Sequence, residues 1–283
     1  MKGLVLTLLL MASHSPPVIN SAAQSSDWKM NGELAARCAL ATLGNVRDER
    51  GAQLAIHCDT DDGDNSVTGS VVMMLSTAAL QYKRITVTAD LEQDSGFSAT
   101  LWIKSLHENQ TVLYDSDVEQ SLLNIGGSGS QRVLSTVVAK DATSISVGMM
   151  LHGKGALALR NVHVTISNDG DVAPQAQQVL DSALQLIRQH SLHTAVDWPQ
   201  LNLRAQQYAS GAQDSADVYP VIRYVLQQLG DARGMVLAPE VSQKLNQRRA
   251  DKQSANVKFF SLPDGAELVL GADAVVDRRI ADR

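Results

Sequence analysis

Aromatic side chains, cysteine and basic charge are all scarce in this chain of 283 residues. Phe, Trp and Tyr together make up 4% of it, two residues are cysteine, and the formal net charge is −6. The acidic balance excludes nucleic acid and anionic membrane surfaces as partners, because both require basic patches to offset phosphate charge. No histidine is paired with a cysteine or an acid at metal-ligand spacing. The sequence therefore predicts neither a metal nor a cofactor.

Residues 1–23 have the pattern of a secretory signal peptide. Met1 and Lys2 give a short positive start, an apolar run follows from Leu4 to Met11, and Ser21-Ala22-Ala23 supplies the small residues of a cleavage site. The apolar run is too short for a membrane span, which needs roughly 20 residues, and no later run is long enough. We therefore expect cleavage near Ala23, a periplasmic or secreted mature protein, and no membrane insertion after cleavage.

The two cysteines are Cys38 and Cys58. An oxidising export compartment permits a disulfide between them, which would stabilise the fold by ~3 kcal/mol in the chain-entropy model. Two buried free thiols remain an alternative. A catalytic thiol is the weakest interpretation, because no Cys-x-x-Cys or His-x-Cys arrangement supports it.

Residues 24–169 read as a domain of short strands. Leu54, Ile56 and Cys58 alternate with polar or small residues, and Gly-rich or Asp-rich turns separate the apolar segments. This pattern indicates an antiparallel β-sandwich, with a jelly roll as the preferred variant. The other expected strands cover 67–75, 85–89, 97–106, 131–138, 144–151 and 156–166.

Residues 172–240 change to a helical period and predict a small bundle of three helices. The first helix has one apolar face made of Ala176, Val179, Leu180, Ala183, Leu184 and Ile187. Asp197 is expected to cap the second helix, and Gly230 to end the third. The third helix is expected to start at Asp214 and to bend at Pro220. With the sandwich, these helices make an α+β chain.

Residues 241–283 are expected to hold a polar linker and the short, incomplete start of a further α/β domain. The stretch 243–252 is polar and basic, which is typical of a solvated helix or a mobile linker. Two short strands are expected at 257–260 and 266–270, with no sheet of their own to join.

Several helical motifs resemble the N-terminal subdomain of secreted tail-specific (C-terminal-processing) serine peptidases. The segments that carry the resemblance are Asp197-Trp198, Gly211-Ala212-Gln213, Asp217-Val218-Tyr219-Pro220-Val221-Ile222 and Leu229-Gly230-Asp231. The strands around Leu101-Trp102-Ile103-Lys104 and Asp141-Ala142-Thr143-Ser144-Ile145 resemble the sandwich that sometimes precedes that subdomain. The two resemblances together cover roughly residues 27–240.

The resemblance stops short of a catalytic site. In that family the nucleophilic serine and its base lie in a later α/β domain, which this sequence does not contain. Arg233 also stands where the family pattern has a histidine, and arginine stays protonated near neutral pH. The resemblance thus implies an exported protein without peptidase activity by itself and without catalytic residues in this chain.

Two other functions remain open from the sequence. One is a periplasmic ligand- or glycan-binding module, for which Trp28, Tyr82, Trp102 and Tyr114 are the candidate exposed aromatics. The other is a peptidase subunit completed in trans by a second chain. The partner is accordingly an unknown peptide, protein or glycan. Asp59, Asp61, Asp62 and Asp64 favour a polar turn, with a structural calcium site as the alternative.

Overall fold

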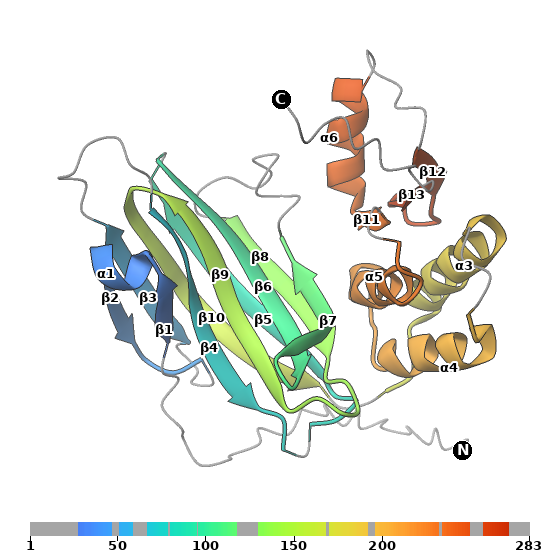
Figure 1. Cartoon of the computed structure of the whole chain (residues 1–283), viewed down its shortest axis with the longest axis horizontal. Helices are drawn as coiled ribbons and strands as arrows, with labels where there is room; N and C mark the ends of the chain where they lie inside the picture. The colour runs from blue at the N-terminus through green and yellow to red at the C-terminus, as the bar shows by residue number, and fades with distance from the viewer. Residues whose placement is uncertain are drawn as a thin grey trace, which may run out of the picture.

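The computed structural model describes residues 28–46, 51–58, 67–78, 80–94, 96–117, 130–167, 170–191, 196–231, 234–249 and 257–271. The predicted signal peptide, the acidic cluster at 59–64 and Arg233 lie outside these residues. Figure 1 shows a β-sandwich at one side of the molecule, with the helices and a small third sheet beside it.

The sandwich consists of two five-stranded antiparallel sheets, as the strand pattern predicts. The front sheet has the order β1 (Lys29–Gly32), β4 (Val67–Ser76), β9 (Ser144–Gly153), β6 (Phe97–His107) and β7 (Gln110–Ser116). The back sheet has the order β2 (Cys38–Leu43), β3 (Ala52–Cys58), β10 (Gly155–Ser167), β5 (Arg84–Gln93) and β8 (Ser130–Val137). A single helical turn, α1 (Leu34–Arg37), joins β1 to β2 and thus carries the chain from one sheet to the other.

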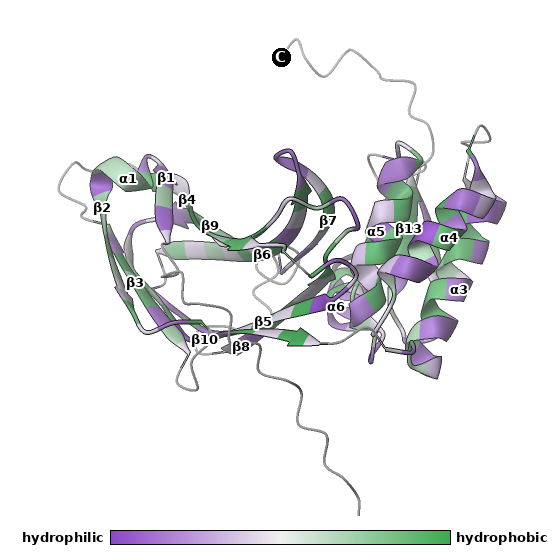
Figure 2. Cartoon of the chain, turned by 90° about the horizontal axis from the view of Figure 1, so that it is seen from below, coloured by the Kyte–Doolittle hydropathy of each residue, from purple (hydrophilic) through white to green (hydrophobic). Residues whose placement is uncertain are grey.

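Side chains alternate between the core and the outside along each strand. In β3, Leu54, Ile56 and Cys58 are buried, while the residues between them are exposed. The inward residues of the two sheets form one continuous hydrophobic core between the layers. Figure 2 shows the front sheet curved, with β1 and β7 raised on either side of β9 and β6.

Cys38 and Cys58 are joined by a disulfide. They are directly opposite each other in the β2–β3 register, with their Cα atoms 4.1 Å apart. Such a close approach is typical of a non-hydrogen-bonded antiparallel pair, where facing side chains lie nearest to each other. The disulfide therefore fastens the edge strand β2 to the rest of the back sheet.

The helical region contains α3 (Pro174–His190), α4 (Trp198–Tyr208), a 3-10 turn (Ala216–Val218), α5 (Tyr219–Gln228) and α6 (Pro239–Arg249). The buried face of α3 consists of the six residues that the period predicts. Asp197 caps α4, where its Oδ1 accepts a hydrogen bond from the Gln200 backbone N–H at 3.1 Å. Gly230 follows α5 with a φ of 72°, a conformation that glycine adopts without strain.

The prediction for the third helix was wrong about where the α-helix starts. The α-helix begins at Tyr219, after a 3-10 turn, and not at Asp214. Pro220 therefore lies in the first turn, where the missing backbone N–H has no intrahelical partner to lose. The expected bend at Pro220 has no physical cause in this position.

The expectation that the two last strands have no sheet to join was also wrong. They are β12 (Val257–Ser261) and β13 (Glu267–Gly271), and both join a third sheet of order β11 (Met235–Leu237), β13 and β12. Leu237 and Val269 of this sheet pack against Val241 of α6. The polar stretch after Pro239 is thus helical, and the apolar residues Val241 and Leu245 pack it against the third sheet.

Candidate functional site

The strand register arranges the outward side chains of the front sheet in rows. One row crosses the sheet as Lys29, Val72, Gly148, Trp102 and Ser116. The next row consists of Met74, Ser146, Lys104 and Tyr114. These two rows bring Trp102, Tyr114, the cations Lys29 and Lys104 and exposed Met74 onto the outer face of the front sheet.

Trp102 forms the floor of this surface. Its indole lies against Gly148, since a Cβ placed on that glycine would come within 2.7 Å of the ring atom Cζ2. The indole N–H donates to Ser146 Oγ at 3.3 Å, and the side chain is 9% exposed. Only glycine at position 148 leaves room for an indole held this close to the sheet.

Lys104 lies over this floor. Its Nζ is 4.6 Å from the centroid of the Trp102 ring, which is within cation–π distance. Burial lowers the pKa of Lys104 from its ordinary value, because an ammonium loses solvation there. The lysine is thus a partly desolvated positive charge on an aromatic surface.

A cavity of about 490 Å³ opens between this part of the front sheet and α5. We call it the α5 pocket. Its lining combines side chains of the sheet, of α5 and of the turn after α5: Lys104, Thr111, Tyr114, Arg223, Leu226, Gln227, Gly230, Asp231 and Gly234. The pocket is therefore built by two parts of the chain that are far apart in sequence.

Arg223 joins the two walls of the α5 pocket. Its guanidinium donates to Asp115 Oδ1 of β7 at 3.1 Å and lies 5.9 Å from the Tyr114 ring centroid. The other carboxylate oxygen of Asp115 accepts the Ser135 backbone N–H at 3.0 Å. Burial raises the pKa of Asp115, and the Arg223 guanidinium opposes that shift.

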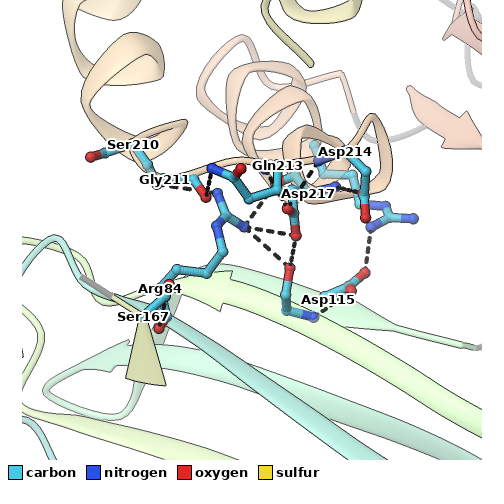
Figure 3. A network of polar contacts seen from close by, with 10 residues as sticks. Arg84, Asp115, Ser167, Ser210, Gly211, Gln213, Asp214 and Asp217 are labelled. Atoms are coloured by element: carbon cyan, nitrogen blue, oxygen red, sulfur yellow. Dashed lines mark hydrogen bonds and ion pairs between the residues drawn. The ribbon is translucent and has the colours of Figure 1, made fainter. Parts of the chain in front are cut away.

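A second buried ion pair holds the helical region against the sandwich, as Figure 3 shows. Arg84 at the start of β5 is 4% exposed, and its Nη1 lies 3.3 Å from Asp217 Oδ1 and 3.1 Å from Ser135 Oγ. The Ser135 hydroxyl donates in turn to Asp217 Oδ1 at 2.5 Å. Arg84 also donates to the backbone oxygens of Asp217 and Ser210. Because α5 directly follows Asp217, this network sets the position of the helical wall of the pocket.

The family-motif residues have roles at the ends of helices. Trp198 begins α4 after the Asp197 cap, and the Tyr219 hydroxyl donates to Asp264 Oδ2 at 2.5 Å between α5 and the β12–β13 turn. Asp231 accepts backbone N–H bonds from Gly234 and Gly271 at 2.8 and 3.1 Å. Of the motif residues, Gly230 and Asp231 also line the α5 pocket.

The four aromatic candidates separate into two groups. Trp28 is buried in the core of the sandwich, and Tyr82 packs partly buried against the same core. Trp102 and Tyr114 lie together on the front face.

Arg223 was not predicted from the sequence, although one signal was available. It is the single charged residue of the apolar helix Tyr219–Gln228, and such a residue usually has a specific partner.

The back sheet has a cavity of its own, of about 550 Å³, on its outer face. We call it the alanine groove, because five alanines of β2, β3 and β10 line it: Ala39, Ala41, Ala55, Ala156 and Ala158. His57, Glu92 and Asp94 supply most of its polar groups. No aromatic side chain is among the described residues that line it.

The described residues give no sign of a metal centre or a membrane span. They contain no cluster of three or more His, Cys, Asp or Glu side chains suited to a metal ion. Among their helices, none has both the length and the apolar character that crossing a bilayer requires.

No family model and no curated protein matches this chain. Membership of the tail-specific peptidase family therefore stays a prediction. Among solved structures, the chain is similar to the enzymatically active domain of bacteriophage CBA120 tailspike protein 4, with 12% identity and a TM-score of 0.34. That similarity covers 50% of this chain and 19% of the tailspike chain.

Two further similarities are to carbohydrate-binding modules. The structure of TmCBM61 in complex with β-1,4-galactotriose matches with 9% identity and a TM-score of 0.32, over 50% of this chain and 88% of that one. The CBM22-1–GH10 modules of Clostridium thermocellum xylanase 10B match with 10% identity and a TM-score of 0.32, over 56% and 29%. TM-scores of this size are too low to assign the chain to any of these families.

Proposed function

We propose that this chain is a non-catalytic glycan-binding protein, which uses the outer face of the front sheet and the α5 pocket. The observation that carries the proposal is the Tyr114 ring at a pocket that is also lined by the donors Lys104, Arg223 and Gln227. A sugar offers an apolar ring face, which packs on an aromatic side chain, and hydroxyls that need polar partners around the edge. A concave site with few, well-placed polar groups suits such a ligand.

Binding is favoured over catalysis by the carboxylates near the pocket. Glycoside hydrolysis usually needs two carboxyl groups about 5–9.5 Å apart, on either side of the scissile bond. Among the described residues, Asp231 is the single acid that lines the pocket, and both its oxygens accept backbone N–H bonds. Asp115 is engaged by Arg223 and Ser135. Neither acid is placed as a general acid with a second carboxylate opposite.

The direct test is retention of the purified chain on a panel of neutral and acidic polysaccharides, followed by calorimetric titration with oligosaccharides of those that retain it. We expect saturable binding and a higher melting temperature with ligand. Tyr114→Ala should weaken binding about tenfold, and Ala158→Glu in the alanine groove is the matched control. The proposal fails if no glycan retains the chain, or if both variants bind like the unmodified protein.

A second proposal concerns the export of the chain and its family relationship, and it is supported by the sequence motifs alone. We propose that the chain is exported and related to tail-specific peptidases without peptidase activity by itself. N-terminal sequencing of the protein recovered outside the cytoplasm should begin near Gln24. Cleavage of unstructured peptides by the purified chain would overturn the inactive assignment, and activity gained only with a copurifying chain would support completion in trans.

A further inference from the structure

The positive charge of Lys104 has no carboxylate to balance it in the described part of the chain. The ion pairs there join Arg84 to Asp217, Arg132 to Asp117, Arg160 to Glu92 and Arg223 to Asp115. The contact of Lys104 is with the uncharged Trp102 ring. A partly desolvated ammonium beside a pocket is an unfavourable arrangement unless an anion completes it.

The neighbours of Lys104 on the sheet are uncharged and polar. Ser146 lies opposite it on β9, and Tyr114 lies opposite it on β7. Both are alternate, outward positions of the front face, so their hydroxyls border the same surface as the ammonium. This surface therefore joins one positive charge to hydroxyls and to an aromatic ring.

The acids closest to the pocket are already engaged by other groups. Asp115 accepts bonds from Arg223 and from the Ser135 N–H. Asp231 accepts the N–H groups of Gly234 and Gly271, which fixes its carboxylate toward the turn after α5. Neither carboxylate pairs with Lys104, so the charge of the lysine remains available to a ligand.

Arg223 is a second cation at the pocket, and it has more N–H donors than its described contacts use. A guanidinium carries five N–H donors, and the described contacts use one nitrogen of Arg223, Nη1, on Asp115. The same side chain lines the pocket and lies beside the Tyr114 ring. Lys104 and Arg223 thus approach the pocket from its two walls, with Tyr114 between them in the lining.

We propose that the α5 pocket binds an acidic sugar, with the carboxylate or sulfate group on Lys104 and the sugar ring against Tyr114. The inference rests on the proposed glycan binding and narrows it to one substrate class, the uronate-containing or sulfated glycans. Arg223 contributes from α5, so the binding site belongs to the sandwich and the helical region together.

The test uses pairs of oligosaccharides that differ only in charge. Oligogalacturonates are compared with their methyl esters, and heparin oligosaccharides with their desulfated forms, by calorimetric titration of the full chain. We expect at least one acidic member to bind about tenfold more tightly than its neutral counterpart, because a charge-assisted hydrogen bond is lost in the neutral form. Added salt should weaken the acidic member selectively.

The other possible results of these titrations each contradict one claim, either the acidic-sugar inference or glycan binding itself. If neutral and acidic members bind equally, the acidic-sugar inference is wrong while glycan binding stands. If no glycan of the wider panel binds, the proposed function itself fails. If inorganic sulfate competes at the same concentration as the acidic sugar, the pocket is a simple anion site, and the inference fails.

Lys104→Met and Lys104→Arg locate the effect at one side chain. Lys104→Met keeps the length and apolar stem, so we expect affinity for the acidic sugar to fall about tenfold, and to fall much more than affinity for its neutral counterpart. Lys104→Arg should restore most of the acidic preference. The melting temperature of unliganded Lys104→Met should equal or exceed that of the unmodified chain, because the variant removes a desolvated charge. Unchanged acidic binding in Lys104→Met would overturn the inference.

Discussion

The two outer faces of the sandwich border cavities of similar size, about 490 Å³ at the α5 pocket and about 550 Å³ at the alanine groove. Their side chains differ. The front face has Trp102, Lys104 and Tyr114, whereas the floor of the back face consists of alanines. Cavity size is therefore a poor guide to function in this molecule, and the chemistry of the lining separates the two faces.

The position of the helical region is a second difference between the faces. The helices lie along the side of the sandwich where β7 and β8 form the sheet edges, and α5 packs against β7. The alanine groove lies toward β2, on the far side of the back sheet. The front-face pocket thus gains a wall from a second part of the chain, and the alanine groove gains none from the described helices.

The largest expected effect comes from breaking the network that positions this wall. Arg84→Met leaves Asp217, whose side chain is 14% exposed, without its cationic partner. We expect a loss of about 3 kcal/mol in the free energy of unfolding, the lower end of the range for breaking a buried pair. Chemical denaturation measures it. The matched control is Arg160→Met on the back face, whose pair with Glu92 is 53% and 47% exposed. An exposed pair contributes about 0–1 kcal/mol. Equal losses in both variants would contradict the importance of the network.

A smaller effect is expected from closing the space under Trp102. In Gly148→Ala, the new Cβ would lie 2.6 Å from the Val71 backbone oxygen and 2.7 Å from the indole. Overpacking of this kind typically costs about 1–3 kcal/mol. The indole should move from the sheet, with a change in tryptophan fluorescence. Ala55→Val on the exposed back face should change stability by no more than about 0.5 kcal/mol.

The pH dependence of Lys104→Met sharpens the comparison further. The folded-state pKa of Lys104 is lowered from 10.5, so the destabilising charge is fully present below the folded pKa and is relieved as pH rises from there to 10.5. The excess stability of Lys104→Met at neutral pH should therefore shrink across that alkaline window. Thermal unfolding at several pH values measures it. The other ionisable side chains of the pocket are Tyr114, Arg223 and Asp231. They are present in both proteins, so their own contributions cancel in the stability difference between the two.

The smallest expected effect is on the back face. Ala158→Glu introduces a charge into the alanine groove, next to Glu92 in the sheet register. Because this face carries no aromatic and no cation in its described lining, we expect glycan affinity to stay within about twofold of the unmodified protein, which is the scatter of surface substitutions. A marked loss of affinity would move the binding site to the back face.

Local patterns predicted the parts of the fold that local physics decides. The alternation through Leu54, the apolar face of α3 and the Asp197 cap each depend on neighbours a few residues away. The three-residue strand β11 was not predicted, because Met235, Val236 and Leu237 are too few to display a period. Its role depends on pairing with β13, which no local pattern encodes.

Only part of the candidate site could be predicted from the sequence, because the rest depends on contacts between residues far apart in the chain. Trp102 and Tyr114 could be named as exposed aromatic candidates, because residue type alone suggests that role. Their meeting on one face depends on the register of β6 with β7, and the approach of Arg223 depends on how α5 docks. The sequence alone does not distinguish Gly148 from any other strand glycine. Its role follows from the Trp102 indole that lies against it.

Helix α5 contacts both the sandwich, through Arg223 and Asp115, and the third sheet, through Tyr219 and Asp264. A force applied to a ligand held in the pocket would thus be divided between the front sheet and this helix. The part-buried polar contacts at the start and in the middle of α5 would resist sliding, and the hydrophobic core beneath would resist separation. If the chain tethers something to a polysaccharide surface, α5 is the element along which the tension would run.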